Sequence, residues 1–147
     1  MQIGEYLKRS RQRLVSCLPE ETLEGVAKLM YAHGVGALPV CEVGTRMVGI
    51  ISERDLVRMF ATANWEELRY MHVRDVMTKH VISCGPDQTM QHAQDLMREH
   101  HFRHLPIMEA GRMIGMLSVR DTLALRLQES EEEIHLLRDA VVAARHR

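Results

Sequence analysis

Two stretches of this chain carry nearly the same pattern of residues. Residues 14–60 align with residues 81–126 over 46 positions, and 17 of the aligned pairs are identical. For ordinary composition about 1 identity in 15 is expected by chance. The offset is 67 residues up to Gly44 and Gly111 and 66 residues after Thr45, which has no counterpart. The chain therefore contains two copies of one supersecondary unit.

The size of the repeat predicts that the two copies pack on each other, because a unit of 46 residues buries too little apolar surface to be stable alone. In each copy a short extended segment, residues 14–17 and 81–84, precedes a helix whose N-cap is Thr22 or Thr89. Gly34 can end the first of these helices, and the second copy has a histidine at the matching position, which is a poorer stop.

A β-hairpin is expected after this helix in each copy. Its strands are predicted at residues 37–42 and 47–51, and at 105–109 and 113–117. Gly44 and Gly111 supply the turns, and Ser52 and Ser118 cap a second helix. The second strand of each pair is continuously apolar, which is typical of burial on both faces. The order β-α-β-β-α, repeated twice, predicts a mixed α/β (α+β) fold with pseudo-two-fold symmetry.

Three kinds of segment lie outside the repeat. Residues 3–7 and 73–77 resemble each other as a short lead-in to each copy, and residues 61–71 link the copies. Residues 128–147 favour a helix with acidic first turns and a basic end, as the helix dipole prefers. A narrow apolar stripe on this helix needs a partner from this chain or from a second subunit; it contains Ile134, Leu137, Val141 and Ala144. The expected domains are 1–66 (first repeat and lead-in), 67–127 (second repeat) and 128–147 (C-terminal amphipathic helix).

The composition indicates a globular protein that binds neither duplex DNA nor a membrane. The 147 residues are 46% hydrophobic and 27% charged. A formal net charge of −1 argues against a duplex-DNA binder that works by bulk charge. No apolar run reaches the roughly 18 residues of a membrane span, and the first residues lack the apolar stretch of a secretory signal. Three cysteines without a C-x-x-C pair fit reduced thiols, so we expect a cytoplasmic protein.

Both copies contain the pattern G-x-x-S-x-x-D, at residues 49–55 and 115–121. It stands where a strand ends and a helix begins, and the free amides and positive end of a helix favour an anion there. A serine hydroxyl can bind a phosphate oxygen, and an aspartate can accept two hydrogen bonds from a diol such as ribose. The same spacing is a near relative of the capping box, which needs no ligand, so both interpretations remain open.

These features resemble the tandem cystathionine-β-synthase (CBS) domain, also called the Bateman module, and above all the small bacterial proteins that consist of one CBS pair. The resemblance lies in LPV with VGIISERD, in LPI with IGMLSVRD and in VRDVM, and it covers about residues 3–126. It implies two packed repeats with clefts for an adenosine-containing ligand such as AMP, ADP or ATP. The implied roles are phosphate binding by Ser52 and Ser118 and ribose binding by Asp55 and Asp121. Arg54 and Arg120 stand beside them, where they can add charge-assisted bonds to phosphate.

The resemblance also implies an adenine site between the first strand of a copy and the segment before its Leu-Pro pair. In the first copy these positions are Val15, Ser16, Gly36, Ala37, Leu38 and Pro39. In the second copy they are Ile82, Ser83, Arg103, His104, Leu105 and Pro106. Backbone amides can read the edges of adenine and apolar walls can hold the ring, but the same residues also suit core and turn positions. Gly36 and Ala37 leave space that Arg103 and His104 fill, so we expect unequal affinities.

Neither metal binding nor catalysis has a convincing pattern. Four histidines cluster in sequence, and His100 and His104 can share a helix face, but no Cys or carboxylate completes a known ligand spacing. Cys17 and Cys84 recur in apolar segments, where thiols are usually inert. The sequence has no P-loop and no nucleophile elbow. We expect no catalytic residue, no metal, and no cofactor apart from an adenine nucleotide as regulatory ligand.

Two functions follow from this pattern. The first is a non-enzymatic regulatory module that binds an adenosine-containing ligand between the repeats and transmits the change to a protein partner. The alternative is a constitutive interaction scaffold with degenerate ligand sites. Both predict a homodimer, because the repeat helices expose apolar faces and two-fold dimers are the commonest oligomers. A nucleic-acid or metal binder that uses histidine and arginine is a third interpretation.

Overall fold

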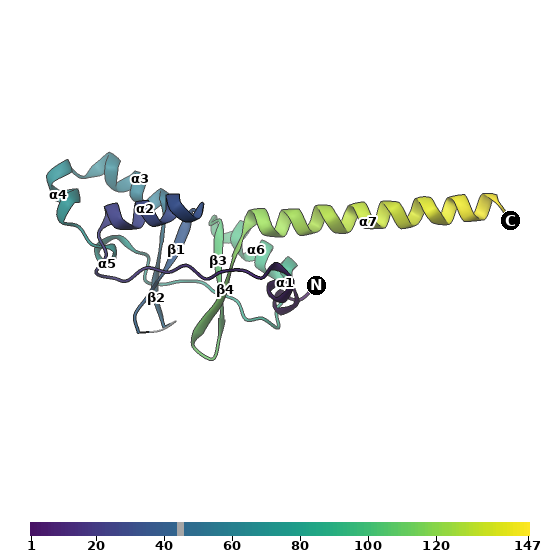
Figure 1. The fold of residues 1–147 in the computed structure, drawn as a ribbon, viewed down its shortest axis with the longest axis horizontal. Coiled ribbons are helices and arrows are strands. Elements are labelled where there is room, and N and C mark those ends of the chain that lie inside the picture. Colours follow the sequence, from purple (N-terminus) through teal and green to yellow (C-terminus); the bar gives the residue numbers. More distant parts are fainter. Residues whose placement is uncertain (44–45) are drawn as a thin grey trace.

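The computed structural model describes residues 1–43 and 46–147 and contains two similar units of helices and hairpins (Figure 1). In chain order its elements are α1 (Ile3–Ser10), α2 (Leu23–His33), β1 (Ala37–Cys41), β2 (Met47–Ser52), α3 (Glu53–Thr62), α4 (Trp65–Tyr70), α5 (Val73–Val76), α6 (Met90–His100), β3 (His104–Glu109), β4 (Arg112–Ser118) and α7 (Val119–Arg145). β1 pairs antiparallel with β2, and β3 with β4, as two separate sheets. The predicted α+β fold of two repeats is confirmed.

The first helix of each copy begins at the predicted threonine cap and ends at the predicted position. The Oγ1 atoms of Thr22 and Thr89 each accept the N–H three residues further on, at 3.0 Å in both copies. The C-cap of α2 is Gly34, whose φ is 63°, and the C-cap of α6 is His101, whose φ is 59°. Both are left-handed conformations that a residue with a Cβ rarely adopts, so His101 is the more strained stop.

The expectation that β2 and β4 are buried on both faces is wrong. Their residues largely alternate between buried and half-buried positions, and the buried ones lie on the face that carries Ile51 and Leu117. The reason is that the second face borders the cavities between the copies, where Ile50 and Met116 are lining residues. The extended segments before the first helices are also shorter than predicted. Each forms a single parallel bridge, from Cys17 to Val40 and from Cys84 to Ile107.

The second hairpin turns through the two residues Ala110 and Gly111, with φ values of 52° and 77°. Positive φ at both central residues is the type I′ geometry that matches the twist of the flanking strands. The turn of the first hairpin, where Gly44 was expected, lies outside the described residues.

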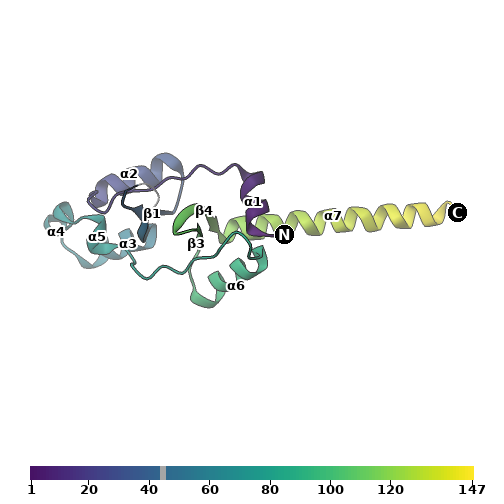
Figure 2. The same cartoon turned by 90° about the horizontal axis from the view of Figure 1, so that it is seen from below.

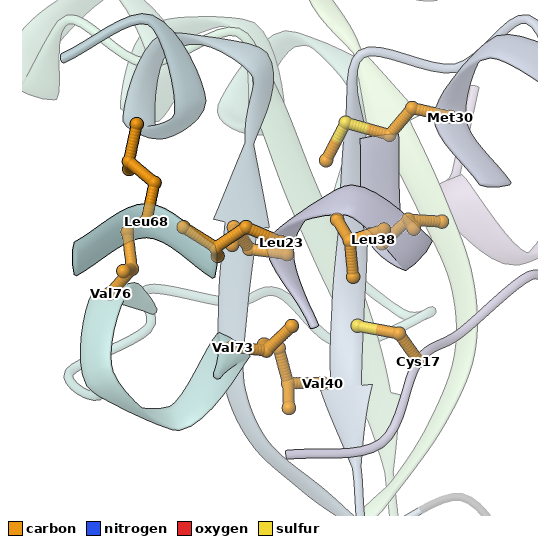
Figure 3. Packing of buried hydrophobic residues seen from close by; sticks show 10 residues of the cluster. Cys17, Leu23, Met30, Leu38, Val40, Leu68, Val73 and Val76 are labelled. Atoms are coloured by element: carbon orange, nitrogen blue, oxygen red, sulfur yellow. The ribbon is translucent and has the colours of Figure 1, made fainter. Parts of the chain in front are cut away.

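Each copy has its own hydrophobic core, and each core is completed by the lead-in of the other copy. The first core contains Cys17, Leu23, Val26, Met30, Leu38, Val40, Ile51, Leu68, Val73 and Val76, most of them labelled in Figure 3. The second contains Ile3, Cys84, Met90, Ala93, Met97, Leu105, Ile107 and Leu117. Backbone hydrogen bonds also join each lead-in to the other copy. The N–H of Val73 donates to the carbonyl of Glu21, and the N–H of Ile3 donates to the carbonyl of Gln88, both at 2.9 Å. Accordingly α1 lies beside the start of α7, the last helix of the second copy, in both views (Figures 1 and 2).

The C-terminal helix is longer than expected. The helix predicted from residue 128 is continuous with the second helix of the second copy, so that α7 runs for 27 residues. Val119 and Leu125 pack against the second core, whereas residues 126–147 are exposed and project from the rest of the protein (Figure 1). Among the described residues, no helix combines the length and the apolar character needed to cross a membrane.

Candidate functional site

Two cavities are lined by residues from both copies. Cleft 1, of about 1380 Å³, lies between residues 34–39 of the first copy and residues 118–121 of the second. Cleft 2, of about 420 Å³, lies between residues 52–55 and residues 100–104. Pockets for small molecules typically measure about 300–1,000 Å³, so both are large enough for a ligand, and cleft 1 is the wider one.

Each cleft joins the strand-to-helix junction of one copy to the base-site candidates of the other. Cleft 1 is lined by Ser118, Arg120 and Asp121 and by Val15, Gly36, Ala37, Leu38 and Pro39. Cleft 2 is lined by Ser52, Arg54 and Asp55 and by Ile82, Arg103 and His104. Residues 36–37 and 103–104 line both clefts, so that they separate the two sites. Comparison of the copies in sequence did not indicate this exchange.

The remaining base-site candidates stand apart from the clefts. In the described part of the chain Ser16, Ser83, Leu105 and Pro106 line neither cavity. The two serines are exposed, and the Leu-Pro pair is buried. The backbone of Pro106 holds the extended segment before α6, since its carbonyl accepts the N–H of Cys84 at 3.1 Å.

The first junction is closed around Asp55. Its Oδ2 accepts the N–H of Ser52 at 2.8 Å and the hydroxyl of Ser52 at 3.0 Å. Its Oδ1 accepts Nη2 of Arg58 at 2.9 Å. The residue is only 7% exposed. A ligand diol would have to displace Arg58 to reach this carboxylate, so the junction is built as a helix cap.

The second junction leaves its carboxylate more accessible. Oδ2 of Asp121 accepts the N–H of Ser118 at 2.8 Å, and the residue is half-buried at the wall of cleft 1. Ala124 occupies the position of Arg58, and no ion pair to Asp121 is found within residues 1–43 and 46–147. The phenol of Tyr6 is a neighbour: burial raises its pKa, and the charge of Asp121 and a hydrogen bond to it raise it further. Because a carboxylate has about four acceptor positions, Asp121 keeps capacity for a ligand.

The start of α7 offers fewer free amides than the sequence suggested. The N–H of Val119 donates to the carbonyl of Arg103 at 2.9 Å, and the N–H of Asp121 donates to Oγ of Ser118 at 3.1 Å. An anion in cleft 1 therefore depends mainly on side chains. Arg13, Arg103 and Arg120 all line this cleft.

His104 lies at the boundary between the two clefts. Burial lowers its pKa from 6.5; Glu53 and Asp121 oppose this effect, and Arg103 and Arg54 reinforce it. The expectation that His100 and His104 share a helix face is wrong, because α6 ends at His100 and His104 begins β3. The helix stops between them at His101, which takes the left-handed conformation.

We expect His104 to make the free protein less stable in acid. Since its folded pKa is lowered, the unfolded chain binds more protons as the pH falls below about 6.5, and stability decreases toward the folded pKa. The melting temperature of His104→Gln should therefore fall less than that of the wild type between pH about 7.5 and about 5.5. The exposed His92→Gln is the matched control and should follow the wild type. Equal losses in His104→Gln and the wild type would contradict this expectation.

Gly49 and Gly115, the first residues of the repeated motif, are packing positions. A Cβ on Gly49 would lie 2.8 Å from the carbonyl oxygen of Thr78, and a Cβ on Gly115 would lie 2.7 Å from Cδ2 of Leu7. In both copies a segment of chain passes close to the strand here: the one with Met77 and Thr78 at Gly49, and the one with Leu7 and Gln12 at Gly115. We call these the crossing segments; they leave no room for a side chain at either glycine.

The crossing segments bind the two strands in different ways. Thr78 exchanges two backbone hydrogen bonds with Ile50, at 3.0 and 2.9 Å. At the equivalent strand residue Met116, the side-chain amide of Gln12 replaces the backbone, with bonds of 2.7 and 2.6 Å. Gln12 also lines cleft 1. The sequence offered no signal for this role, because residues 11–13 read only as a polar segment.

Cys17, Cys41 and Cys84 are buried, and burial raises the pKa of Cys17 to about 12 and also raises the pKa of the other two. The reactive thiolate is therefore scarce at neutral pH. In the part of the chain that the structure describes, no group of three or more His, Cys, Asp or Glu residues is placed to hold a metal ion.

The duplicated hairpin-and-helix units, their exchanged lead-ins and their shared clefts define a paired-repeat α+β module. The family model of the CBS domain matches residues 3–62 and 73–127, and the chain belongs to this family. The CBS domain-containing protein YhcV of Bacillus subtilis is 32% identical over 113 residues, which are 77% of this chain and 78% of YhcV. Inosine-5′-monophosphate dehydrogenase of Korarchaeum cryptofilum is 34% identical over 109 residues, 74% of this chain but only 21% of that enzyme.

Solved structures of CBS pairs have the same fold. The CBS-domain protein ATU1752 of Agrobacterium tumefaciens superimposes with a TM-score of 0.80 and 29% identity, over 86% of this chain and 99% of that one. CBSX2 in complex with AMP has a TM-score of 0.75 and 24% identity, over 88% and 98% of the two chains. At that identity the CBSX2 structure shows the fold alone.

Proposed function

We propose that this protein is a non-enzymatic regulatory module that binds an adenosine-containing ligand in cleft 1. The observation that carries the proposal is the accessible carboxylate of Asp121, which stands beside Ser118 at the wall of a cleft lined by three arginines. A ligand with a ribose diol and a phosphate matches these groups. The AMP complex of CBSX2 supports the proposal because a protein with this fold holds such a molecule.

The parts of the ligand are assigned to separate walls of cleft 1. Asp121 accepts hydrogen bonds from the ribose hydroxyls. Ser118 and Arg120 bind phosphate, with Arg13 and Arg103 as further cations that line the cleft. The adenine lies against the half-buried Val15 and Gly36 and the buried Ala37, Leu38 and Pro39, which together form the apolar wall.

Binding in cleft 1 acts on both copies at once, because its walls come from both. A ligand shifts the relative arrangement of the copies only as far as it prefers one arrangement over the other. Asp121 lies in the first turn of α7, so the start of this long helix belongs to the ligand site. A partner protein that contacts α7 or the second copy senses the shift.

Titration calorimetry and thermal shift with AMP, ATP and S-adenosylmethionine test this function. We expect at least one of them to release or absorb heat and to raise the melting temperature, since a ligand present at 100 times its Kd stabilises by about 2.7 kcal/mol. GMP is the control for the base. If none of the adenosine ligands gives heat or a thermal shift at about millimolar concentration, the sensor function is excluded.

That outcome would favour the second candidate function, a constitutive interaction scaffold with degenerate sites. The observation behind this candidate is the first junction, where Arg58 and Ser52 occupy the carboxylate of Asp55. A cleft whose aspartate is already bonded on both oxygens needs no ligand to be complete. We therefore assign cleft 2 a structural role in both candidate functions.

A further inference from the structure

The projecting part of α7 is a long helix without a tertiary partner in the described chain. α7 extends to Arg145, and residues 126–147 are all exposed. A helix in water gains most of its stability from packing of one face, since propensity alone supports a helix of this length only marginally. Figures 1 and 2 show the segment extending away from both repeats in two perpendicular views. A surface that covers it must therefore come from outside the chain.

A series of residues in this segment, all apolar except Ser130, follows a heptad spacing. Starting from Leu123, steps of four and three residues lead to Leu127, Ser130, Ile134, Leu137, Val141 and Ala144. In heptad notation Leu127, Ile134 and Val141 occupy a positions, and the others occupy d positions. The side chains lie open, with Leu127 62% and Leu137 60% exposed. Two of the three a residues are β-branched and two of the four d residues are leucine. This combination favours a parallel two-stranded coiled coil.

The charges that flank the heptad seam complement each other across such a dimer. In a parallel pair, a g residue meets the e residue five positions further on in the other helix. Arg126 then meets Glu131, and Glu133 meets Arg138, so both charged g positions have opposite charges as partners. In the described part of one chain, none of these four residues forms an ion pair.

The polar contacts within α7 leave this seam free. Gln128 donates to Glu132 at 3.2 Å, and His135 lies 3.5 Å from Asp139, all on the opposite face of the helix. Ser130, the polar residue of the seam, bonds its hydroxyl to the carbonyl of Arg126 at 3.0 Å. It therefore enters a helix interface with its donor satisfied.

We propose that a second copy of this chain covers the seam, and that the two α7 helices form a parallel, in-register coiled coil from Leu123 to Ala144. An antiparallel pair centred between Ile134 and Leu137 fits less well. It retains the contact of Glu131 with Arg138 but sets Glu133 opposite Ala140. The coiled coil does not depend on any ligand, so its test is independent of the proposed function.

Mass measurement on the full chain at tens of micromolar tests the seam. The wild type is expected at twice the 16.9 kDa of one chain. Leu137→Asp places a charge in the seam and is expected to give monomers. Leu136→Asp is the matched control: Leu136 is 68% exposed on the same helix but lies outside the seam, so this variant stays dimeric. A monomeric wild type, or a dimer that survives Leu137→Asp, overturns the proposal.

The orientation of the helices is tested with Ala144→Cys. Two parallel chains bring these d positions together, and mild oxidation is expected to give a covalent dimer in most of the protein. The native cysteines do not compete, because all three are buried. Reversal of one charge pair gives a second readout: Glu133→Arg weakens the dimer, and adding Arg138→Glu restores it. A dimer that fails to cross-link at residue 144, or is not restored, is not the parallel pair.

Discussion

Replacing Asp121 by Asn will weaken the binding of the active adenosine ligand by about ten- to a hundredfold, whereas Asp55→Asn will leave it within about twofold. Hydrogen bonds to a charged group contribute about 1.5–3 kcal/mol, and each 1.4 kcal/mol is a factor of ten in affinity. Asp121 is half-buried at cleft 1, whereas Asp55 is held by Ser52 and Arg58. The change to Asn removes the charge but keeps one oxygen that can still accept the N–H at the helix cap.

The two variants form a matched pair because both aspartates complete a capping box. Their melting temperatures without ligand report on capping, which contributes about 0.5–2 kcal/mol. Titration calorimetry on the same samples reports on binding. The assignment of the site to cleft 1 fails if Asp55→Asn abolishes binding and Asp121→Asn does not. Equal losses in both variants would mean that both clefts bind ligand.

Gly49→Ala is expected to lower the free energy of unfolding by about 1–3 kcal/mol, the usual range for an overpacked core. Its new methyl would lie 2.8 Å from the carbonyl oxygen of Thr78 and 2.7 Å from Sδ of Met77. The sulfur atom can move. The carbonyl of Thr78 cannot, because Thr78 is hydrogen-bonded to both the N–H and the carbonyl of Ile50. The strand and the crossing segment must therefore separate. Urea denaturation measures the loss directly.

Gly115→Ala is the control from the second copy. Its methyl would meet the two terminal carbons of Leu7, at 2.7 and 2.8 Å, and both belong to one flexible side chain. A rotation of that side chain relieves the contact, so we expect a loss below about 1 kcal/mol. If Gly115→Ala is the more damaging change, the backbone crossing at Thr78 is not what requires glycine in this motif.

The elements of the fold were predictable because each copy carries local signals that act over a few residues. Thr22 and Thr89 stand where a helix must begin, and Ser52 and Ser118 cap the second helices with the predicted spacing to aspartate. The positive φ of Gly111 follows from a two-residue turn between apolar strands. These features depend on residues that are close in sequence, and the repeat contains each of these patterns twice.

What the sequence could not show is how the copies are combined. The lead-in with Ile3 precedes the first copy in sequence but packs on the second, and nothing in its residues distinguishes the two docking sites. The same holds for the clefts, which pair Asp121 with residues 36–39 rather than with its own copy. The unequal junctions did leave a trace, because Arg58 and Ala124 occupy matching positions three residues after the aspartates. Only the geometry shows that this arginine bonds Asp55.

The exchanged lead-ins impose an order on how the chain matures during synthesis. The first core needs Val73 and Val76, so the first copy cannot close until these residues have left the ribosome. Ile3, made almost at once, has to wait for Leu105, Ile107 and Leu117 before its own site exists. The first and the last residues of the module to be synthesised thus enter the same hydrophobic core. A nascent chain halted between the repeats would expose an unfinished apolar surface for chaperones to bind.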